Sequence, residues 1–234
     1  MNRVAICRRI EHTGVVPVIR ASTPEQAWLA CRALHAGGVD VFEVTMTVPD
    51  AVNVIRELVA HFRGEVLVGA GTVLDATTAR ACIRAGAQFV VSPGFDADIV
   101  RAVHEAEKPA LPGALTPTEI MAALRAGADI IKVFPASAMG GAKYLRSLRA
   151  PFEYARFLPT GGVNVSTARE FIAAGAVALG VGSELIDAQA LATGDGETIT
   201  LRARELVAQV RLARQELASE KTTQQSGTQK AVLG

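Results

Sequence analysis

Short apolar runs recur along the chain, and each follows a turn that contains glycine. One phrase occurs four times, as "LHAGGVDVFEVT", "IRAGAQFVVSP", "LRAGADIIKVF" and "IAAGAVALGVG". Glycine just past a helix adopts the left-handed backbone conformation easily, and the apolar run after it is too short for a helix and rich in β-branched residues. Each copy therefore predicts the end of a helix, an Ala-Gly stop and a buried strand.

Four further apolar runs complete the pattern, one before the first repeat and one between each pair of repeats. They are "GVVPVIR" at 14–20, "EVLVGAGT" at 65–72, "KPALPGA" at 108–114 and "ARFLPTGG" at 155–162. Helices are expected between the strands, and two of them have capping-box spacing with proline in the first turn, at Ser22 to Glu25 and at Thr116 to Glu119.

Buried strands that alternate with helices indicate a parallel sheet covered on both faces. Eight such units predict the α/β class and a single-domain (β/α)8 TIM barrel. An open, doubly wound sheet is the alternative, because the pattern does not show whether the first and last strands pair. The barrel is expected over residues 1–217, with its last helix at about 196–217. The polar, aperiodic residues 218–234 predict a disordered tail.

Composition narrows the classes of function. The chain has 234 residues, and half of them are hydrophobic, enough for one sizeable core. Lysine and arginine number 24 against 23 acidic residues, so the net charge is too small to attract nucleic acid or an anionic membrane. No apolar run reaches the roughly 18 residues that span a bilayer, and the charged start of the chain does not resemble a signal peptide. The three dispersed cysteines, Cys7, Cys31 and Cys82, predict buried thiols in a reducing compartment, and hence a cytoplasmic protein.

The chemistry of a barrel is expected at the carboxyl ends of its strands, where the loops converge. Three of the residues there are charged and the others are small or hydroxylated, which leaves room for a small polar ligand. In chain order the strand ends carry Arg20, then Glu43 with Thr45 and Thr47, then 69–72, Ser92 and Pro93, Pro112 and Gly113, Lys132, 160–162 and 180–183.

Lys132 stands between apolar residues in "GADIIKVFPAS". Taking an ammonium group out of water is costly, and desolvation favours the neutral amine, which attacks carbonyl carbon to form an iminium. Glu43 is the only acid among the strand ends and is the candidate proton carrier. A catalytic pair is one interpretation, and a structural ion pair between Lys132 and Glu43 is the other.

Arg20 is either a clamp for a carboxylate or a solvated charge. The "TGG" and "GVGS" turns after the seventh and eighth strands are either tight turns or a phosphate site, since backbone N–H groups hold phosphate at this place in such barrels. The glycine motifs lack the spacing of nucleotide-binding loops, and the histidines and cysteines lack ligand spacing. We therefore expect no metal and no cofactor.

Six motifs match a known family in order and spacing. They are "FEVTMTVPDA", "VGAGTVLD", "VSPGFD", "IKVFPAS", "FLPTGGVN" and "GVGSEL", and they resemble the 2-keto-3-deoxy-6-phosphogluconate (KDPG) and 4-hydroxy-2-oxoglutarate (KHG) aldolases from about residue 15 to 216. The resemblance implies a class I aldolase, a homotrimer of barrels without cofactors. It cleaves 2-dehydro-3-deoxy-6-phosphogluconate to pyruvate and glyceraldehyde 3-phosphate in Entner-Doudoroff metabolism and also acts on 4-hydroxy-2-oxoglutarate.

Position by position, the resemblance implies that Lys132 forms the Schiff base and that Glu43 is the acid and base. The resemblance also implies that a further set of residues binds the substrate. In this set Thr72, Pro93 and Arg20 line the pyruvate pocket, Thr160 lies beside it, Phe134 lies near the aldehyde, and Gly161, Gly162 and Ser183 bind the phosphate.

One position departs from the best-known branch of the family, in which an arginine four residues after the glutamate binds the pyruvate carboxylate. Here that position is Thr47, and the arginine at the end of the first strand, Arg20, is the other candidate. Aldolases for the 6-phosphogalactonate epimer share this arginine, so they remain an alternative. A phosphate-binding isomerase or epimerase barrel and a non-catalytic sugar-phosphate binder are two more.

Overall fold

The computed structural model describes the backbone of residues 1–232 and the side chains of residues 1–220. All eight predicted strand regions are present. The strands are β1 (Val15–Ile19), β2 (Val41–Thr45), β3 (Leu67–Gly71), β4 (Val90–Val91), β5 (Ala110–Leu111), β6 (Gly113–Ala114), β7 (Ile131–Val133), β8 (Phe157–Pro159) and β9 (Leu179–Val181). One predicted strand is divided into β5 and β6, because Pro112 between them has no N–H group for the ladder.

The strands form a closed ring. Six of them pair in the order β5-β4-β3-β2-β1-β9 and three in the order β6-β7-β8, all parallel. The chain itself joins β5 to β6 at Pro112. The bridges Phe157↔Ala176 and Thr160↔Gly180 join the β8 region to the β9 region. The predicted (β/α)8 barrel is therefore confirmed over the open sheet.

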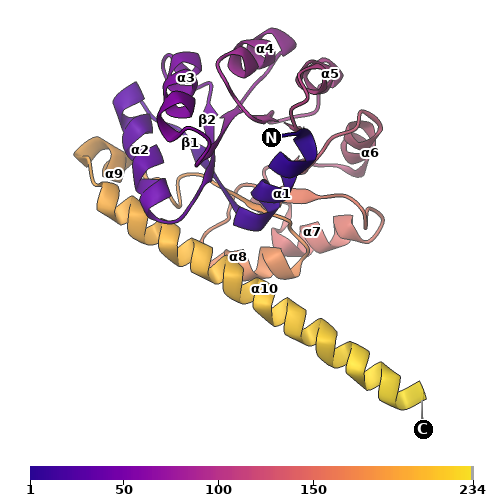
Figure 1. Ribbon diagram of the computed structural model, residues 1–234. Coiled ribbons are helices and arrows are strands. Elements are labelled where there is room, and N and C mark those ends of the chain that lie inside the picture. Colours follow the sequence, from indigo (N-terminus) through magenta and orange to yellow (C-terminus); the bar gives the residue numbers. More distant parts are fainter. Residues whose placement is uncertain (233–234) are drawn as a thin grey trace.

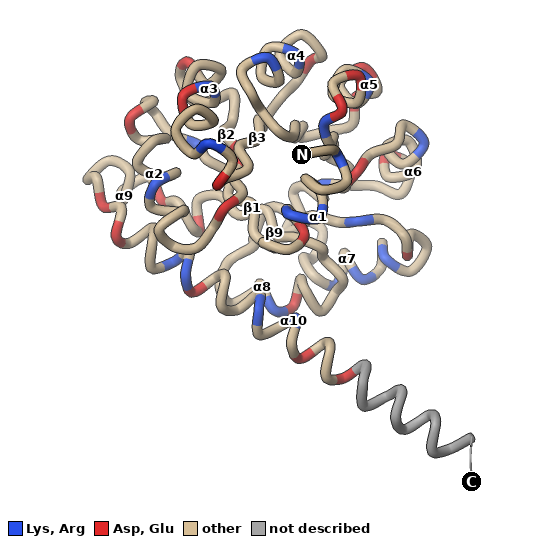
Figure 2. Tube along the Cα trace, in the orientation of Figure 1, with Lys and Arg blue, Asp and Glu red and all other residues tan. Residues whose placement is uncertain are grey.

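Helices surround the strands (Figure 1). They are α1 (Arg3–Thr13), α2 (Pro24–Ala36), α3 (Ala51–Phe62), α4 (Ala76–Arg84), α5 (Ala97–Glu105), α6 (Pro117–Arg125), α7 (Ala142–Arg149), α8 (Val165–Ala173), α9 (Ala188–Thr193) and α10 (Gly196–Val232), with a 3-10 turn at Ser137–Met139. Figure 2 shows positive and negative residues interspersed around this ring. No helix among the described residues is both long enough and apolar enough to cross a bilayer.

The helix starts agree with one predicted cap and correct the other. Thr116 and Glu119 form the expected capping box at α6. At α2 the cap is Thr23, whose side chain accepts from the Gln26 N–H, so the predicted start at Ser22 is one residue too early. Thr23 is the residue directly before the proline of the first turn, which is the usual place for a cap.

The last helix is longer than its pattern predicts. α10 runs Gly196–Val232, so its end near 217 and the disordered tail predicted from 218 are both corrected for the residues up to 232. Loss of an apolar face does not end a helix by itself, because each added residue gains a hydrogen bond without a new nucleus. Residues 233–234, the rest of the predicted tail, lie outside the described residues.

Two apolar clusters make up the core. The larger cluster fills the space between the strands and the outer helices. The smaller lies inside the barrel and contains strand residues such as Leu67, Phe89 and Leu158 together with Ile6 and Ile10 from α1. α1, which the repeat does not predict, therefore closes the amino-terminal end of the barrel.

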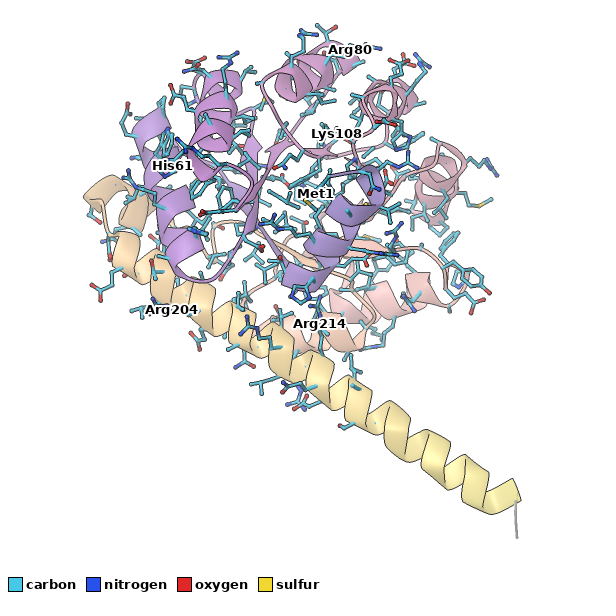
Figure 3. All side chains as sticks on the ribbon, viewed as in Figure 1. Met1, His61, Arg80, Lys108, Arg204 and Arg214 are labelled. Carbon is cyan, nitrogen blue, oxygen red and sulfur yellow. The ribbon has the colours of Figure 1, made fainter. Side chains whose placement is uncertain are left out.

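Polar contacts hold α1 in place on several sides. The Arg3 Nε atom lies 3.0 Å from Asp129 Oδ1, and the Arg9 Nε atom lies 2.9 Å from Asp40 Oδ2. Arg214 reaches from α10 toward the end of α1 (Figure 3) and donates to the carbonyl oxygens of Glu11 and His12. The closed end leaves the carboxyl ends of the strands as the open mouth of the barrel.

We expect Ile10→Ala to lower the free energy of unfolding by about 2–5 kcal/mol, because it opens a cavity beneath the barrel interior where Ile10 is fully buried. Urea unfolding followed by circular dichroism measures the change. Val4→Ala on the same helix is the control, since Val4 is 57% exposed. Equal unfolding midpoints for the two variants would show that α1 does not seal the core.

All three cysteines are free and buried, as predicted. Burial raises the pKa of Cys7 to about 11, with a further contribution from Asp129, and burial also raises the pKa of Cys82 to about 11 and that of Cys31. At pH 8 only about one thiol in a thousand is then a thiolate. We expect native protein to react with a thiol-disulfide reagent far more slowly than protein unfolded in guanidinium. A rapid native reaction of any one thiol would contradict this.

Candidate active site

Lys132 on β7 and Glu43 on β2 meet inside the mouth of the barrel. Lys132 is 3% exposed and Glu43 is 1% exposed. The Lys132 Nζ atom lies 3.5 Å from Glu43 Oε1. This distance is at the long limit for a hydrogen bond, so the pair is in contact without a tight bond. The two groups can therefore exchange partners with a ligand.

The same nitrogen lies over an aromatic ring. Lys132 Nζ is 5.5 Å from the centroid of Phe134, within the range of a cation–π contact. Phe134 is half-buried at the end of β7, on the same side of the strand as Lys132. The apolar ring limits the access of water to the amine from that side.

Glycines in the strands make room for these side chains. A Cβ atom at Gly71 would lie 2.2 Å from Glu43 Oε1, and one at Gly180 would lie 2.0 Å from Thr160 Oγ1. Real Cβ contacts are not this short. Two positions that the sequence marks only as small are therefore required to be glycine, so that Glu43 and Thr160 fit inside the barrel.

Arg20 and Thr72 meet across the ends of β1 and β3. Arg20 is exposed, and its Nη2 atom donates to Thr72 Oγ1 over 3.4 Å. Thr72 has a φ of 56°, a region that β-branched residues rarely occupy. Such strain is kept at sites where the surrounding structure fixes a side chain for a purpose. The two residues place a guanidinium and a hydroxyl group at the rim of the mouth.

Thr45 and Thr47 extend this rim along β2. Thr45 is fully buried, and its Oγ1 atom donates to the Ile19 carbonyl oxygen over 2.9 Å. Thr47 is exposed, and its Oγ1 atom lies 2.6 Å from Thr45 Oγ1. Nothing in the sequence pattern marks the bond to Ile19, because it depends on the register between β1 and β2.

Thr160 and Pro93 lie on other sides of the mouth. Thr160 is 6% exposed, and among the described residues its hydroxyl oxygen has no hydrogen-bond partner. A buried polar group without a partner is costly, which indicates that a ligand or a water molecule satisfies it. Pro93 is half-buried after β4, and its carbonyl oxygen packs where a Cβ atom at Gly113 would be.

Gly161 and Gly162 follow β8 with φ values of 93° and 72°, in the left-handed region that favours glycine. Ser183 follows β9, is exposed, and lines a groove of about 720 Å³ together with Arg20 and Thr47. It also lines a second hollow with Asn164, the residue that caps α8. Asn164 is not among the site residues predicted from the sequence, although an Asn before a helix is a usual cap signal.

Of the eleven predicted site residues, Glu43 and Lys132 thus lie in the middle of their strands, and the other nine lie within three residues after the carboxyl end of a strand. Contacts join Lys132 to Glu43 and Phe134, and Arg20 to Thr72, while the groove joins Arg20 and Thr47 to Ser183. Among the described residues, no three His, Cys, Asp or Glu side chains gather closely enough to hold a metal ion.

Comparison with known proteins places this arrangement in context. The family model described as "KDPG and KHG aldolase" matches residues 6–201. The KHG/KDPG aldolase of Escherichia coli strain K12 is 41% identical over 198 residues, which are 85% of this chain and 92% of that protein.

Two solved structures are similar over most of the chain. The KDPG aldolase of Legionella pneumophila, with pyruvate captured as a covalent carbinolamine intermediate, is 31% identical at a TM-score of 0.80. The match covers 86% of this chain and 97% of that one. A structure described as native KDPGal is 30% identical, also at a TM-score of 0.80, over 86% of this chain and 96% of that one.

Proposed function

Because this chain belongs to the KDPG and KHG aldolase family, we propose that it is a class I aldolase. Its substrate is 2-dehydro-3-deoxy-6-phosphogluconate, which it cleaves to pyruvate and glyceraldehyde 3-phosphate, and it also acts on 4-hydroxy-2-oxoglutarate. One observation carries the proposal. A lysine amine and a carboxylate lie 3.5 Å apart in the nearly dry mouth of the barrel.

The reaction uses Lys132 as the nucleophile. Its neutral amine attacks the keto carbon, C2, and the carbinolamine formed loses water to give an iminium. Removal of the C4 hydroxyl proton then breaks the C3–C4 bond. The electron pair moves into the iminium and leaves an enamine on Lys132 with the aldehyde released. Protonation of C3 and hydrolysis of the iminium release pyruvate and restore the amine.

Glu43 is the group placed to move these protons. It is the carboxylate next to the amine, and a buried carboxyl group exchanges protons with a bound substrate without competition from bulk water. The long Lys132–Glu43 contact supports this role, because it leaves oxygen lone pairs of Glu43 available for a substrate hydroxyl or a water molecule.

The remaining residues are assigned by their place around the mouth. We assign the keto-acid carboxylate to Arg20 and Thr72 at the rim of β1 and β3, because they offer N–H and O–H donors. The walls of the pocket are Pro93, Phe134 and Thr160. We assign the phosphate to the Gly161 and Gly162 turn and to Ser183, near the capped start of α8.

Borohydride trapping tests the class of reaction. With pyruvate present, reduction should fix an adduct on the peptide that contains Lys132, seen as a mass increase, and protein treated without pyruvate should stay unmodified. A protein that binds a sugar phosphate but traps no adduct would instead be an isomerase, epimerase or non-catalytic binder, since none of these needs the amine.

Ser183→Ala should raise KM for the phosphorylated substrate about tenfold with little change in kcat, because a lost phosphate contact removes binding energy common to substrate and transition state. Steady-state kinetics on 2-dehydro-3-deoxy-6-phosphogluconate measure the effect. The unphosphorylated 4-hydroxy-2-oxoglutarate is the matched control, and its KM should not change. An equal rise in KM for both substrates would show that Ser183 does not bind the phosphate.

A second substrate is favoured by one observation. Arg20 stands at the end of β1, where it resembles the arginine of aldolases for the 6-phosphogalactonate epimer, and the structure described as native KDPGal is similar to this chain. A comparison of kcat/KM for the two epimers decides between them.

We also propose that the protein is a homotrimer that works in Entner-Doudoroff metabolism. Light scattering, which measures the molar mass in solution, tests the homotrimer. Its cytoplasmic location is supported by three free cysteines, which are typical of reducing compartments.

A further inference from the structure

A short chain of hydroxyl groups connects the ends of β1 and β2. Thr45 Oγ1 lies 2.9 Å from the Ile19 carbonyl oxygen and 2.6 Å from Thr47 Oγ1. Ile19 directly precedes Arg20, and Thr47 is exposed at the rim. Thr45 itself is 0% exposed, so it does not touch a ligand. It links the backbone next to Arg20 to the side chain of Thr47, and Arg20 and Thr47 are the two candidates for binding the carboxylate.

The direction of these hydrogen bonds follows from the number of hydrogens. A threonine hydroxyl has one hydrogen, and a carbonyl oxygen only accepts. Thr45 must therefore donate its hydrogen to the Ile19 carbonyl, so Thr47 must donate its own hydrogen to Thr45. Thr47 then offers a ligand only lone pairs. A carboxylate also has only lone pairs at its oxygens, so the Thr47 hydroxyl does not stabilise it.

Thr72, on the β3 side of the rim, differs from Thr47. Arg20 donates to Thr72 Oγ1, and among the described residues the Thr72 hydroxyl donates its own hydrogen to no side chain or backbone group. The guanidinium of Arg20 also has five N–H groups, of which this bond uses one. Arg20 and Thr72 thus both have hydrogens to donate to a carboxylate, and Thr47 has none.

We propose that Thr45 is a positioning residue for recognition of the keto-acid carboxylate, an inference that rests on the proposed aldolase function. Thr45 ties the end of β1, which bears Arg20, to β2, and it engages the only hydrogen of Thr47. The carboxylate is thereby directed to Arg20 and Thr72. This decides between Arg20 and Thr47, the two candidates that the sequence leaves open.

Thr45→Val tests the role, since valine has the same shape and cannot donate. In the aldol addition direction, the half-saturating concentration of pyruvate should rise about tenfold, the effect of about 1.4 kcal/mol, while kcat changes less than about twofold. Thr45→Ser, which keeps the hydroxyl, should restore the wild-type value. Thr200→Val is the matched control. Thr200 Oγ1 makes the same kind of bond, to the Ala33 carbonyl over 2.9 Å, but on α10.

Two further variants keep the test decisive even if Thr45→Val folds poorly. Thr72→Val should raise the half-saturating concentration of pyruvate more than Thr47→Val does. The reverse order would overturn the proposal, because it would show that Thr47 supplies the donor. A Thr45→Val protein with a lower unfolding midpoint but an unchanged half-saturating concentration would also overturn it, since the role would then be structural only.

Borohydride trapping separates this inference from the function on which it rests. Each variant should still form the reduced adduct at saturating pyruvate, because Lys132 and Glu43 are unchanged. If wild-type protein forms no adduct, the proposed aldolase function fails. If all the variants form it at the same pyruvate concentration as the wild type, the function stands and the role of Thr45 fails.

Discussion

Lys132→Ala is expected to lower the rate of aldol cleavage at least about a thousandfold and to abolish borohydride trapping with pyruvate, because no other amine lies beside Glu43 in the described mouth of the barrel. Steady-state cleavage, coupled to detection of pyruvate, measures the first effect, and intact-protein mass spectrometry measures the second. This is the largest effect that we predict, since the covalent path disappears with its nucleophile.

The variant also bears on stability. Removing Lys132 leaves Glu43 buried without its partner, and breaking a buried pair in this way typically costs about 3–5 kcal/mol. Activity should therefore be compared only at temperatures where circular dichroism shows the variant folded. Lys143→Ala, an exposed lysine on α7, is the matched control and should keep wild-type activity and trapping. Substantial trapping in folded Lys132→Ala would assign the nucleophile to another lysine.

Glu43→Gln is expected to lower kcat by about two to four orders of magnitude while still permitting slow formation of the pyruvate adduct. The amide keeps the shape of the side chain and a contact with Lys132, but it cannot carry the proton between the C4 hydroxyl, water and C3. Single-turnover trapping over time separates adduct formation from turnover, which is followed as pyruvate release.

Glu105→Gln on the outer helix α5 is the matched control for this change. Glu105 lies on the surface, where it pairs with Arg80, and its substitution should leave both rates unchanged. Normal turnover in Glu43→Gln would remove Glu43 from the mechanism and leave its contact with Lys132 as a structural ion pair. Loss of both trapping and turnover would instead show that Glu43 is needed to form the adduct.

Much of the fold could be predicted from the sequence, because the apolar residues of each short segment show which part of it is buried. The four Ala-Gly repeats and the apolar runs between them mark all eight strand regions. The short strands after Gly37, Gly86, Gly127 and Gly175 lie where the repeat places them. Some element boundaries differ from the predicted ones. Pro112 divides one strand, α2 is capped by Thr23, and α10 continues beyond its amphipathic part.

The candidate site, like the fold, could be predicted from the sequence only in part. The apolar pattern alone shows which residues lie on or just after the strands, and a lysine between apolar neighbours marks Lys132 as a candidate. That Lys132 and Glu43, which are 89 residues apart, come within 3.5 Å is visible only in the folded barrel. The same is true of the room that Gly71 leaves for Glu43 and of the bond that joins Thr45 to the Ile19 carbonyl. The physical reason is that periodicity records whether each side chain is buried, whereas the distance between two side chains depends on strand register and barrel closure, which no single segment encodes.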